Sequence, residues 1–246
     1  MTVAHRVAVA FRFLTRFPVR VTDESSDARG GAVAYFPVVG LALGVCLAAV
    51  AWLLTSRVPA PLLGVVLVAL LAGITGGLHL DGLGDVFDGL GGGHGDRART
   101  LAIMRDSRVG AHGAVALILV LVAKVVAITG LVAHQDWRLL VAFPVVARWA
   151  VVPLVVWFPY GRPEGLGKSF NAQGSGREVA IATGILVVVG IWAGRRFIGP
   201  TLVALAVALA LGAWLQRRLG GLTGDVYGAA IELAEVGFVM AAQQEA

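Results

Sequence analysis

Charged residues are scarce in this chain. They make up 14% of its 246 residues, whereas hydrophobic residues make up 58%. An ordinary soluble domain carries about 25% charged residues, so the charges here are too few to cover a water-exposed surface. This shortage excludes a typical soluble domain, a disordered chain and a nucleic-acid-binding module.

Cysteine and alternating polar patterns are also lacking. The single cysteine, Cys46, excludes an intramolecular disulfide. The apolar stretches are continuous and do not alternate with polar residues, which argues against a membrane β-barrel. A helical membrane protein remains as the fold class.

Long apolar runs are present instead, and several reach the roughly 20 residues that a spanning helix needs. We predict one all-α polytopic membrane domain over residues 1–246, with about six to seven transmembrane helices. Residues 5–17 predict an amphipathic interfacial helix, because arginines occupy one sector and phenylalanines lie mostly elsewhere. The glycine pairs Gly40/Gly44 and Gly73/Gly77 predict close helix contacts. The predicted spans are 33–54, 60–79, 110–133, 139–158, 179–194, 200–216 and, more weakly, 226–243.

Basic residues concentrate on one side of this topology. Most of the 20 lysines and arginines lie on the side of the N-terminus, which the positive-inside rule makes cytoplasmic. Nearly all acids share that side, an arrangement that favours an enzyme over a transporter, whose polar groups should lie near the midplane. The cytoplasmic loops are predicted at 80–109, 159–178 and 217–225, in a multi-pass protein of the cell membrane.

Three aspartates stand out in the stretch 76–110. Asp81, Asp85 and Asp88 follow an i, i+4, i+7 spacing and share one helix face. Three like charges repel unless a cation neutralises them, and Mg²⁺ binds through one or two carboxylates plus substrate phosphate. The spacing favours a Mg²⁺ site formed by these residues, with a hydrated acidic helix cap as the alternative. Interleaved glycines suit the close approach of a ligand or a second backbone.

Cations suited to phosphate follow this stretch. Arg105 and Arg108 flank Asp106, and arginine recognises phosphate with two parallel hydrogen bonds. Ordinary loop charge is the alternative for these arginines. His79 precedes Asp81 by two residues and is a candidate general base or ligand, or a hydrogen-bonded structural histidine.

Two later segments add further polar candidates. The second loop brings Arg162 and Glu164 to a glycine-containing turn, and the third contributes Asp225. Acids inside a membrane segment are costly and usually functional. Glu232 and Glu235 are two such acids, and Lys124 and Arg148 are the cations inside the predicted spans with which they could pair. Such a pair could be a buried structural ion pair, or these residues could have a functional role.

Several motifs together resemble the cobalamin synthase family, adenosylcobinamide-GDP ribazoletransferase. The resemblance runs in order along nearly the whole chain, and the blocks HLDGLGDVFDG and IMRDSRVGAHG are its most specific parts. The matching pieces are FLTRFPV at 13–19, YFPVVGLALG at 35–44, GGLHLDGLGDVFDG at 76–89, LAIMRDSRVGAHG at 101–113, ARW at 147–149, YGRPEGLG at 160–167 and GGLTGDVYGA at 220–229.

The resemblance implies a defined reaction. A hydroxyl of α-ribazole or α-ribazole 5′-phosphate attacks the cobinamide-linked phosphate of adenosylcobinamide-GDP, GMP leaves, and adenosylcobalamin or its 5′-phosphate forms. It also implies Mg²⁺ dependence, a bacterial inner membrane, and the lipid bilayer as a partner. A homo-oligomer is compatible with it, and nucleic acid is not a partner.

Site roles follow from the matching positions. Asp81, Asp85 and Asp88 are assigned to Mg²⁺, and the catalytic proton acceptor is sought among His79, Asp81 and Asp85. Substrate binding is assigned to Arg105, Asp106, Arg108, Arg162, Glu164 and Asp225, with the three arginines as phosphate clamps.

Two rival functions are weighed against this one. A CDP-alcohol phosphotransferase also uses an Asp-rich membrane helix, but its pattern continues from the Asp-Gly pair with Ala-Arg, which is missing after Asp81–Gly82. A transporter would use the intramembrane ions, which should then converge on a midplane cavity while Asp81 and Asp85 point into bulk solvent.

Overall fold

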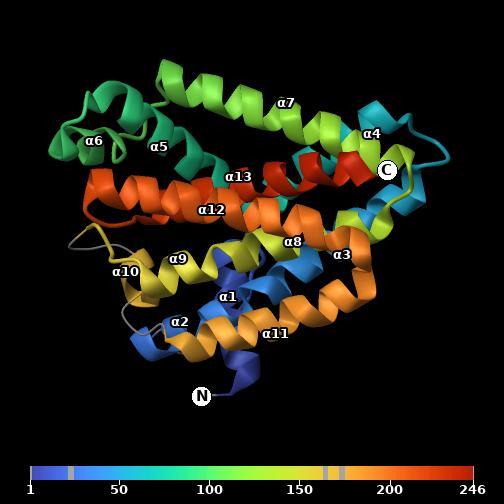
Figure 1. The fold of residues 1–246 in the computed structure, drawn as a ribbon, viewed down its shortest axis with the longest axis horizontal. Helices are drawn as coiled ribbons and strands as arrows, with labels where there is room; N and C mark the ends of the chain where they lie inside the picture. The colour runs from blue at the N-terminus through green and yellow to red at the C-terminus, as the bar shows by residue number, and fades with distance from the viewer. Residues whose placement is uncertain (1, 22–24, 163–165, 172–174, 246) are drawn as a thin grey trace.

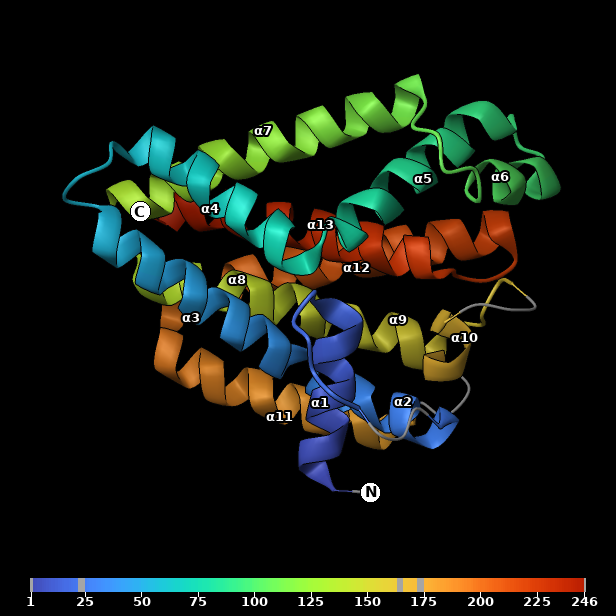
Figure 2. The ribbon, with the colours of Figure 1, turned by 180° about the vertical axis from the view of Figure 1, so that it is seen from behind.

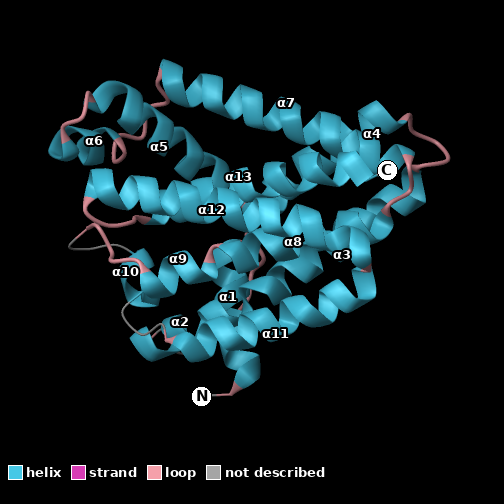
Figure 3. Ribbon diagram, viewed as in Figure 1, coloured by secondary structure: helices cyan, strands magenta, loops and turns pink. Residues whose placement is uncertain are grey.

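The structure is a computed structural model that describes residues 2–21, 25–162, 166–171 and 175–245. Throughout these ranges the chain forms helices and no strand (Figure 3). The predicted all-α class is therefore confirmed. The helices are α1 Val3–Leu14, α2 Ser26–Ala32, α3 Phe36–Leu54, α4 Ala60–Thr75, α5 Leu78–Gly93, α6 Arg97–Ile103, α7 Ala111–Ala133, α8 Trp137–Ala150, α9 Val152–Trp157, α10 Leu166–Asn171, α11 Gly176–Ala193, α12 Ile198–Leu219 and α13 Gly224–Ala241, with short 3₁₀ turns at Val33–Tyr35, Arg195–Phe197 and Ala242–Glu245.

Within the described residues, five helical segments are long and apolar enough to cross a membrane, or six if α4 and α5 count as one bent span. Their outer faces are apolar, as lipid contact requires. On α7, for example, Val115, Ile118, Leu119 and Val122 form one exposed stripe. The five segments are residues 28–54, 111–133, 137–157, 176–193 and 195–219.

Helix α13, predicted as the weakest span, is not among these segments. It holds Asp225, Glu232 and Glu235 within 18 residues, and these acids lower its hydropathy. It is instead an interior helix that packs against α5, α7, α8 and α12 (Figure 1).

Helix α8 forms the centre of the bundle. Nearly all of the segment formed by α8 and α9 is buried. Gly40 and Gly44 of α3 lie against the backbone of α8, where a side chain would collide with the carbonyl oxygens of Pro144 and Val141. The predicted close contact at this glycine pair is confirmed. Among the described residues, no atom lies within 4 Å of where a side chain on Gly73 or Gly77 would begin, so the same spacing does not mark a contact there.

The predicted span 60–79 is wrong at its end. Helix α4 stops at Thr75, and Gly76 and Gly77 adopt positive φ angles of 64° and 71°, which glycine tolerates without a steric penalty. The chain turns by 90° into α5 (Figure 2). The break positions the aspartates of α5 beside α13.

The predicted loops are shorter and more helical than expected. Residues 80–109 contain most of α5 and all of α6, residues 159–178 contain α10 and the start of α11, and only residues 220–223 separate α12 from α13. We call the end of the bundle formed by residues 94–96, 104–110, 158–162 and 220–223 the site end; it lies at the left in Figure 1.

The N-terminal helix α1 runs across the long helices rather than along them (Figures 1 and 2). It buries Val9, Ala10 and Leu14 on one face, in agreement with the predicted amphipathic character. It ends at Leu14 rather than at residue 17, because Thr15 adopts an extended conformation. The N–H of Arg16 then donates to the carbonyl of Ile74 at 2.8 Å, which joins α1 to the end of α4.

Candidate active site

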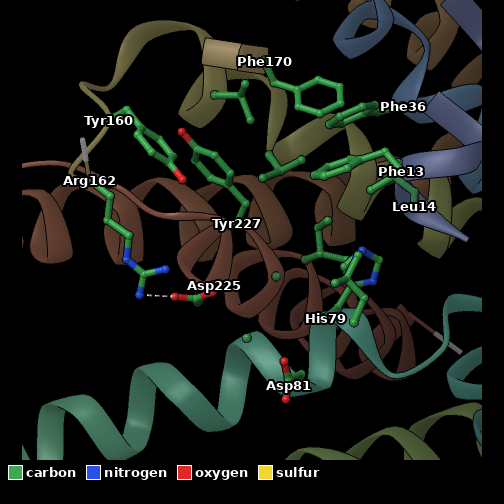
Figure 4. Close-up of a pocket in the computed structure, with 17 residues that line it drawn as sticks. Phe13, Leu14, Phe36, His79, Asp81, Tyr160, Arg162, Phe170, Asp225 and Tyr227 are labelled. Carbon is green, nitrogen blue, oxygen red and sulfur yellow. Dashed lines mark ion pairs between the residues drawn. The ribbon is translucent and has the colours of Figure 1, made fainter. Parts of the chain in front are cut away.

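A pocket of about 220 Å³ lies where α1, α3, α5, α9, α10 and α13 meet (Figure 4). One end is aromatic and contains Phe13, Phe36 and Phe170. The other end is polar. It contains Asp81, Tyr160, Arg162, Asp225 and Tyr227.

Two glycine-containing turns hold the polar end together. The N–H of Gly161 donates to the carbonyl of Leu222 at 2.7 Å, and the N–H of Leu222 donates to the carbonyl of Pro159 at 2.8 Å. Gly161 and Gly221 touch backbone to backbone, so that a side chain on either would fall 2.7 Å from the other. The motifs YGRP and GGLTGD therefore form one paired unit.

Hydrogen bonds from Arg97 hold the same two turns in place. Nε of Arg97, on α6, donates to the carbonyl of Leu219 at 2.6 Å, and a terminal nitrogen donates to the carbonyl of Gly161 at 3.4 Å. Arg97 thus connects α6 to the end of α12 and to the turn that carries Arg162.

This pairing places Arg162 beside Asp225. Their side chains form an ion pair at 2.7 Å and are 13% and 21% exposed. Asp225 lies in the first turn of α13, where the helix dipole favours a negative charge, and it accepts a hydrogen bond from Thr223. Burial raises the pKa of the Asp225 carboxyl, and Arg162 acts against that rise.

Helix α5 approaches Asp225 closely because Gly82 has no side chain. An added Cβ at Gly82 would lie 2.7 Å from the carbonyl oxygen of Asp225. The prediction that a second backbone approaches these glycines is thus confirmed at Gly82. Asp81 lines the pocket, whereas Asp85 does not line it but lies close enough for the charges of Asp81, Asp225 and Arg162 to act on it.

The resulting group holds more negative than positive charge. Asp85 is half-buried, repelled by Asp81 and Asp225, and attracted by Arg162. Three carboxylates thus share one guanidinium. Among the described residues, no three His, Cys, Asp or Glu side chains lie close enough to hold a metal alone. The donor set fits an ion such as Mg²⁺ that takes one or two carboxylates and completes its shell with water and phosphate.

Asp88, predicted as the third metal ligand, lies apart from the pocket. Its two carboxylate oxygens accept the N–H groups of Gly110 at 2.7 Å and Gly113 at 2.8 Å. These N–H groups belong to the start of α7, where a helix leaves donors unpaired. Asp88 therefore caps α7 in this structure.

The cationic motif after α6 is also not brought into the pocket. Arg108 and Asp106 pair with each other, with the shortest contact at 2.5 Å. Hydrogen bonds from Arg108 lower the pKa of Asp106 to about 2. Arg105 is exposed, and its charge acts on Tyr160. Of the predicted phosphate clamps, only Arg162 lines the pocket; Glu164 lies outside the described residues.

His79 connects the pocket to a buried ion cluster. It lines the pocket and is 2% exposed, and its Nδ1 lies 3.5 Å from a terminal nitrogen of Arg148. Its Nε2 has no hydrogen-bond partner among the described residues.

The buried ion cluster contains the four intramembrane charges. Lys124 contacts Glu232 at 2.5 Å and also pairs with Glu235, which in turn pairs with Arg148. Their side chains are 0–6% exposed. The expected pairing of these acids with Lys124 and Arg148 is thus confirmed.

Several pocket residues were not predicted as site residues. Phe13, Phe36, Phe170 and Tyr227 all line the pocket. Three lie within the motifs that carry the family resemblance, and that position is the signal that could have found them. Phe170 lies just after the second loop motif. Its place in the pocket becomes apparent only from the structure, where its ring centre lies 4.3 Å from that of Phe13.

Comparison with known proteins identifies the family of this chain. The family model described as cobalamin-5-phosphate synthase matches residues 6–243. Relatives named adenosylcobinamide-GDP ribazoletransferase include one from Geotalea daltonii, 41% identical over 93% of this chain and 92% of the relative, and one from Pseudomonas aeruginosa, 40% identical over 95% of each. A third, from Roseiflexus sp., is 41% identical over 94% of this chain and 86% of the relative. No solved structure matches. The chain belongs to the cobalamin-5-phosphate synthase family.

Proposed function

We propose that this chain transfers the cobinamide phosphate moiety of adenosylcobinamide-GDP to a ribose hydroxyl of α-ribazole or α-ribazole 5′-phosphate. The hydroxyl oxygen forms a bond to the cobinamide-linked phosphorus. The bond from that phosphorus to the bridging oxygen breaks, and GMP leaves with the bridging oxygen. The product is adenosylcobalamin or its 5′-phosphate, which completes the nucleotide loop of the cobalamin.

The single observation that carries this proposal is the charge of the pocket. Asp81, Asp225 and Arg162 line the polar end of a largely apolar cavity, and Asp85 lies near enough for the charges of all three to act on it. A phosphoryl transfer needs positioned phosphates, compensation of their charge and a group that accepts the hydroxyl proton. The family match at about 40% identity over most of the chain supports the same substrates.

Mg²⁺ is part of the proposal. Asp81 and Asp85 would hold it, with Asp225 close by, and substrate phosphate would complete its oxygen shell. When bound, the ion compensates the negative charge of the diphosphate. Arg162 contacts a phosphate oxygen with its planar fork. Asp225 holds that fork in place through their ion pair.

The proton of the attacking hydroxyl passes to a carboxylate in this arrangement. Asp81 is exposed at the pocket and is the carboxylate that incoming substrate reaches first. His79 is less suited to take the proton, because the Arg148 guanidinium donates toward its Nδ1 and so favours the proton on Nε2.

The site end is assigned to the cytoplasmic face of the bacterial inner membrane. Basic residues are concentrated at that end, among them Arg97, Arg99, Arg217 and Arg218, as the positive-inside rule requires. Both soluble nucleotide substrates would then reach the pocket from the cytosol.

The test is an activity assay on the protein in liposomes. Adenosylcobinamide-GDP, α-ribazole 5′-phosphate and Mg²⁺ are supplied, and corrinoid product and GMP are followed by chromatography. Equimolar product and GMP, lost on addition of EDTA and in Asp85→Asn, are expected. The matched control is Asp136→Asn, which removes an aspartate paired with Arg196 at the opposite end of the bundle. Folded wild-type protein that releases no GMP would overturn the proposal.

A further inference from the structure

The aromatic end of the pocket has no part in the phosphoryl chemistry proposed above. Phe13, Phe36 and Phe170 pack with ring centres 4.3–6.0 Å apart. They contribute an apolar wall of flat faces and edges, which suits a planar aromatic ligand. Phosphate, diphosphate and Mg²⁺ gain nothing from such a wall, so another part of a substrate must occupy it.

A hydroxyl without a partner stands beside this wall. Tyr227 is 5% exposed, and its hydroxyl has no hydrogen-bond partner in the described part of the chain. In Figure 4 Tyr227 lies between the phenylalanine group and Tyr160. Buried hydroxyls in folded proteins are nearly always paired. A pocket-lining hydroxyl left unpaired therefore indicates a ligand group that would complete it.

The size of the pocket limits what it holds. Pockets for drug-sized ligands measure roughly 300–1,000 Å³, and this one measures about 220 Å³. It has room for a bicyclic base with part of its sugar, and it is too small for a corrin macrocycle with its side chains.

A second, larger pocket adjoins the first. It measures about 720 Å³, is lined by Arg12 and Arg16 of the N-terminal segment, and shares Leu78 and Asp81 with the smaller pocket. Arginines suit a diphosphate, and the volume suits the larger substrate. Asp81 is thus the polar residue common to an aromatic pocket and an arginine-lined pocket, where two substrates would meet.

We propose, on the basis of the proposed function, that the small pocket binds the acceptor nucleoside, with its planar aromatic base against Phe13, Phe36 and Phe170. The Tyr227 hydroxyl contacts the ribose, and the attacking hydroxyl faces Asp81. The corrinoid part of the donor remains in the larger pocket beside Arg12 and Arg16, and only its diphosphate reaches past Asp81 to Arg162. Base preference is then determined by the phenylalanine wall.

The experiment compares two variants in the liposome assay. Tyr227→Phe removes only a hydroxyl without a partner in the described protein, so the fold should not lose stability. Phe170→Leu keeps an apolar side chain and removes the aromatic face. Each variant should raise the KM for α-ribazole about 3- to 10-fold, while the KM for adenosylcobinamide-GDP changes less than about twofold. An unchanged KM for α-ribazole, or a change confined to the corrinoid, would overturn the inference.

The control is Phe197→Leu, which removes one ring of the Phe197–Phe238 pair at the opposite end of the bundle. It should leave both KM values unchanged. Equilibrium dialysis of α-ribazole against the liposomes separates this inference from the proposed function. If wild-type protein shows no turnover, retention of α-ribazole that weakens in Tyr227→Phe still supports the nucleoside pocket, and absence of retention refutes it.

Discussion

Two groups of charged residues in this protein both combine carboxylates with cations but differ in charge balance. The buried cluster pairs Lys124 and Arg148 with Glu232 and Glu235, so its formal charge is zero. The pocket group opposes three carboxylates with the single guanidinium of Arg162. Burial costs are severe for an unbalanced set of charges, and the balanced group is indeed the fully buried one. The unbalanced group adjoins a cavity, where a bound cation could supply the missing positive charge.

The largest effect is expected from a substitution that breaks the charge balance of the buried cluster. Glu235→Gln leaves two cations with one carboxylate, and an uncompensated buried charge costs about 3–5 kcal/mol. Thermal unfolding in detergent should therefore occur at a much lower temperature, with activity lost in proportion to folded protein. Glu232→Gln should cost less, because among the described residues the Glu232 carboxylate forms an ion pair with Lys124 alone. Variants that unfold normally but are inactive would show that this cluster serves catalysis instead.

The second largest effect is expected from a substitution that reduces the excess negative charge beside the pocket. Asp85→Asn removes one of three repelling carboxylates, so the thermal unfolding temperature should stay the same or rise. Activity should fall about 100-fold or more, because electrostatic groups at a phosphoryl transfer site contribute several kcal/mol. Stability and activity are measured on the same preparation. A parallel loss of both would place Asp85 with the structural charges.

Asp88→Ala sharpens the contrast within a single helix. It removes the acceptor for the N–H groups of Gly110 and Gly113 and should cost about 1–2 kcal/mol of stability, as a lost helix cap does. Specific activity per folded molecule should fall far less than in Asp85→Asn. If the specific activity of Asp88→Ala fell to that of Asp85→Asn while its stability stayed unchanged, Asp88 would belong to the metal site after all.

The smallest effect is expected at the exposed pair of Asp106 and Arg108. Arg108 lowers the pKa of Asp106 to about 2, so the stabilisation from this pair is present above the ordinary aspartate pKa and lost only as the pH falls toward 2. Between pH 5 and pH 9, roughly, the pair stays ionised. Asp106→Asn should therefore change activity less than about twofold across that range in a pH–activity profile. A larger change would indicate that Asp106 meets the substrate.

Much of the fold follows from the sequence because lipid requires apolar runs that are easy to recognise. The bend after Thr75 escapes this signal, since hydrophobicity continues through Ile74 and Leu78 while only backbone angles change at Gly76 and Gly77. Glycine spacing has the same weakness. Gly44 contacts a neighbouring helix and Gly73 does not, because the spacing does not say whether a partner lies opposite.

The site could be predicted in part for similar reasons. The spacing places Asp81 and Asp85 on one helix face, and in the structure the charge of Asp81 acts on Asp85; the Mg²⁺ role of both stays a prediction. Asp88 shares that spacing, yet α7 begins against it and takes up both carboxylate oxygens. The pairing of Arg162 with Asp225 and the aromatic wall with Phe170 depend on contacts between distant segments, which periodicity does not encode.

The contact between Gly161 and Gly221 has a consequence for how this protein can vary. Two stretches far apart in the sequence meet there through main chain alone, so neither holds a side chain that could shrink to make room for a change in the other. Insertions, deletions and larger residues at either position would separate Arg162 from Asp225. The two turns are therefore expected to be inherited as one unit, tolerant of exchange together between relatives and intolerant of exchange singly.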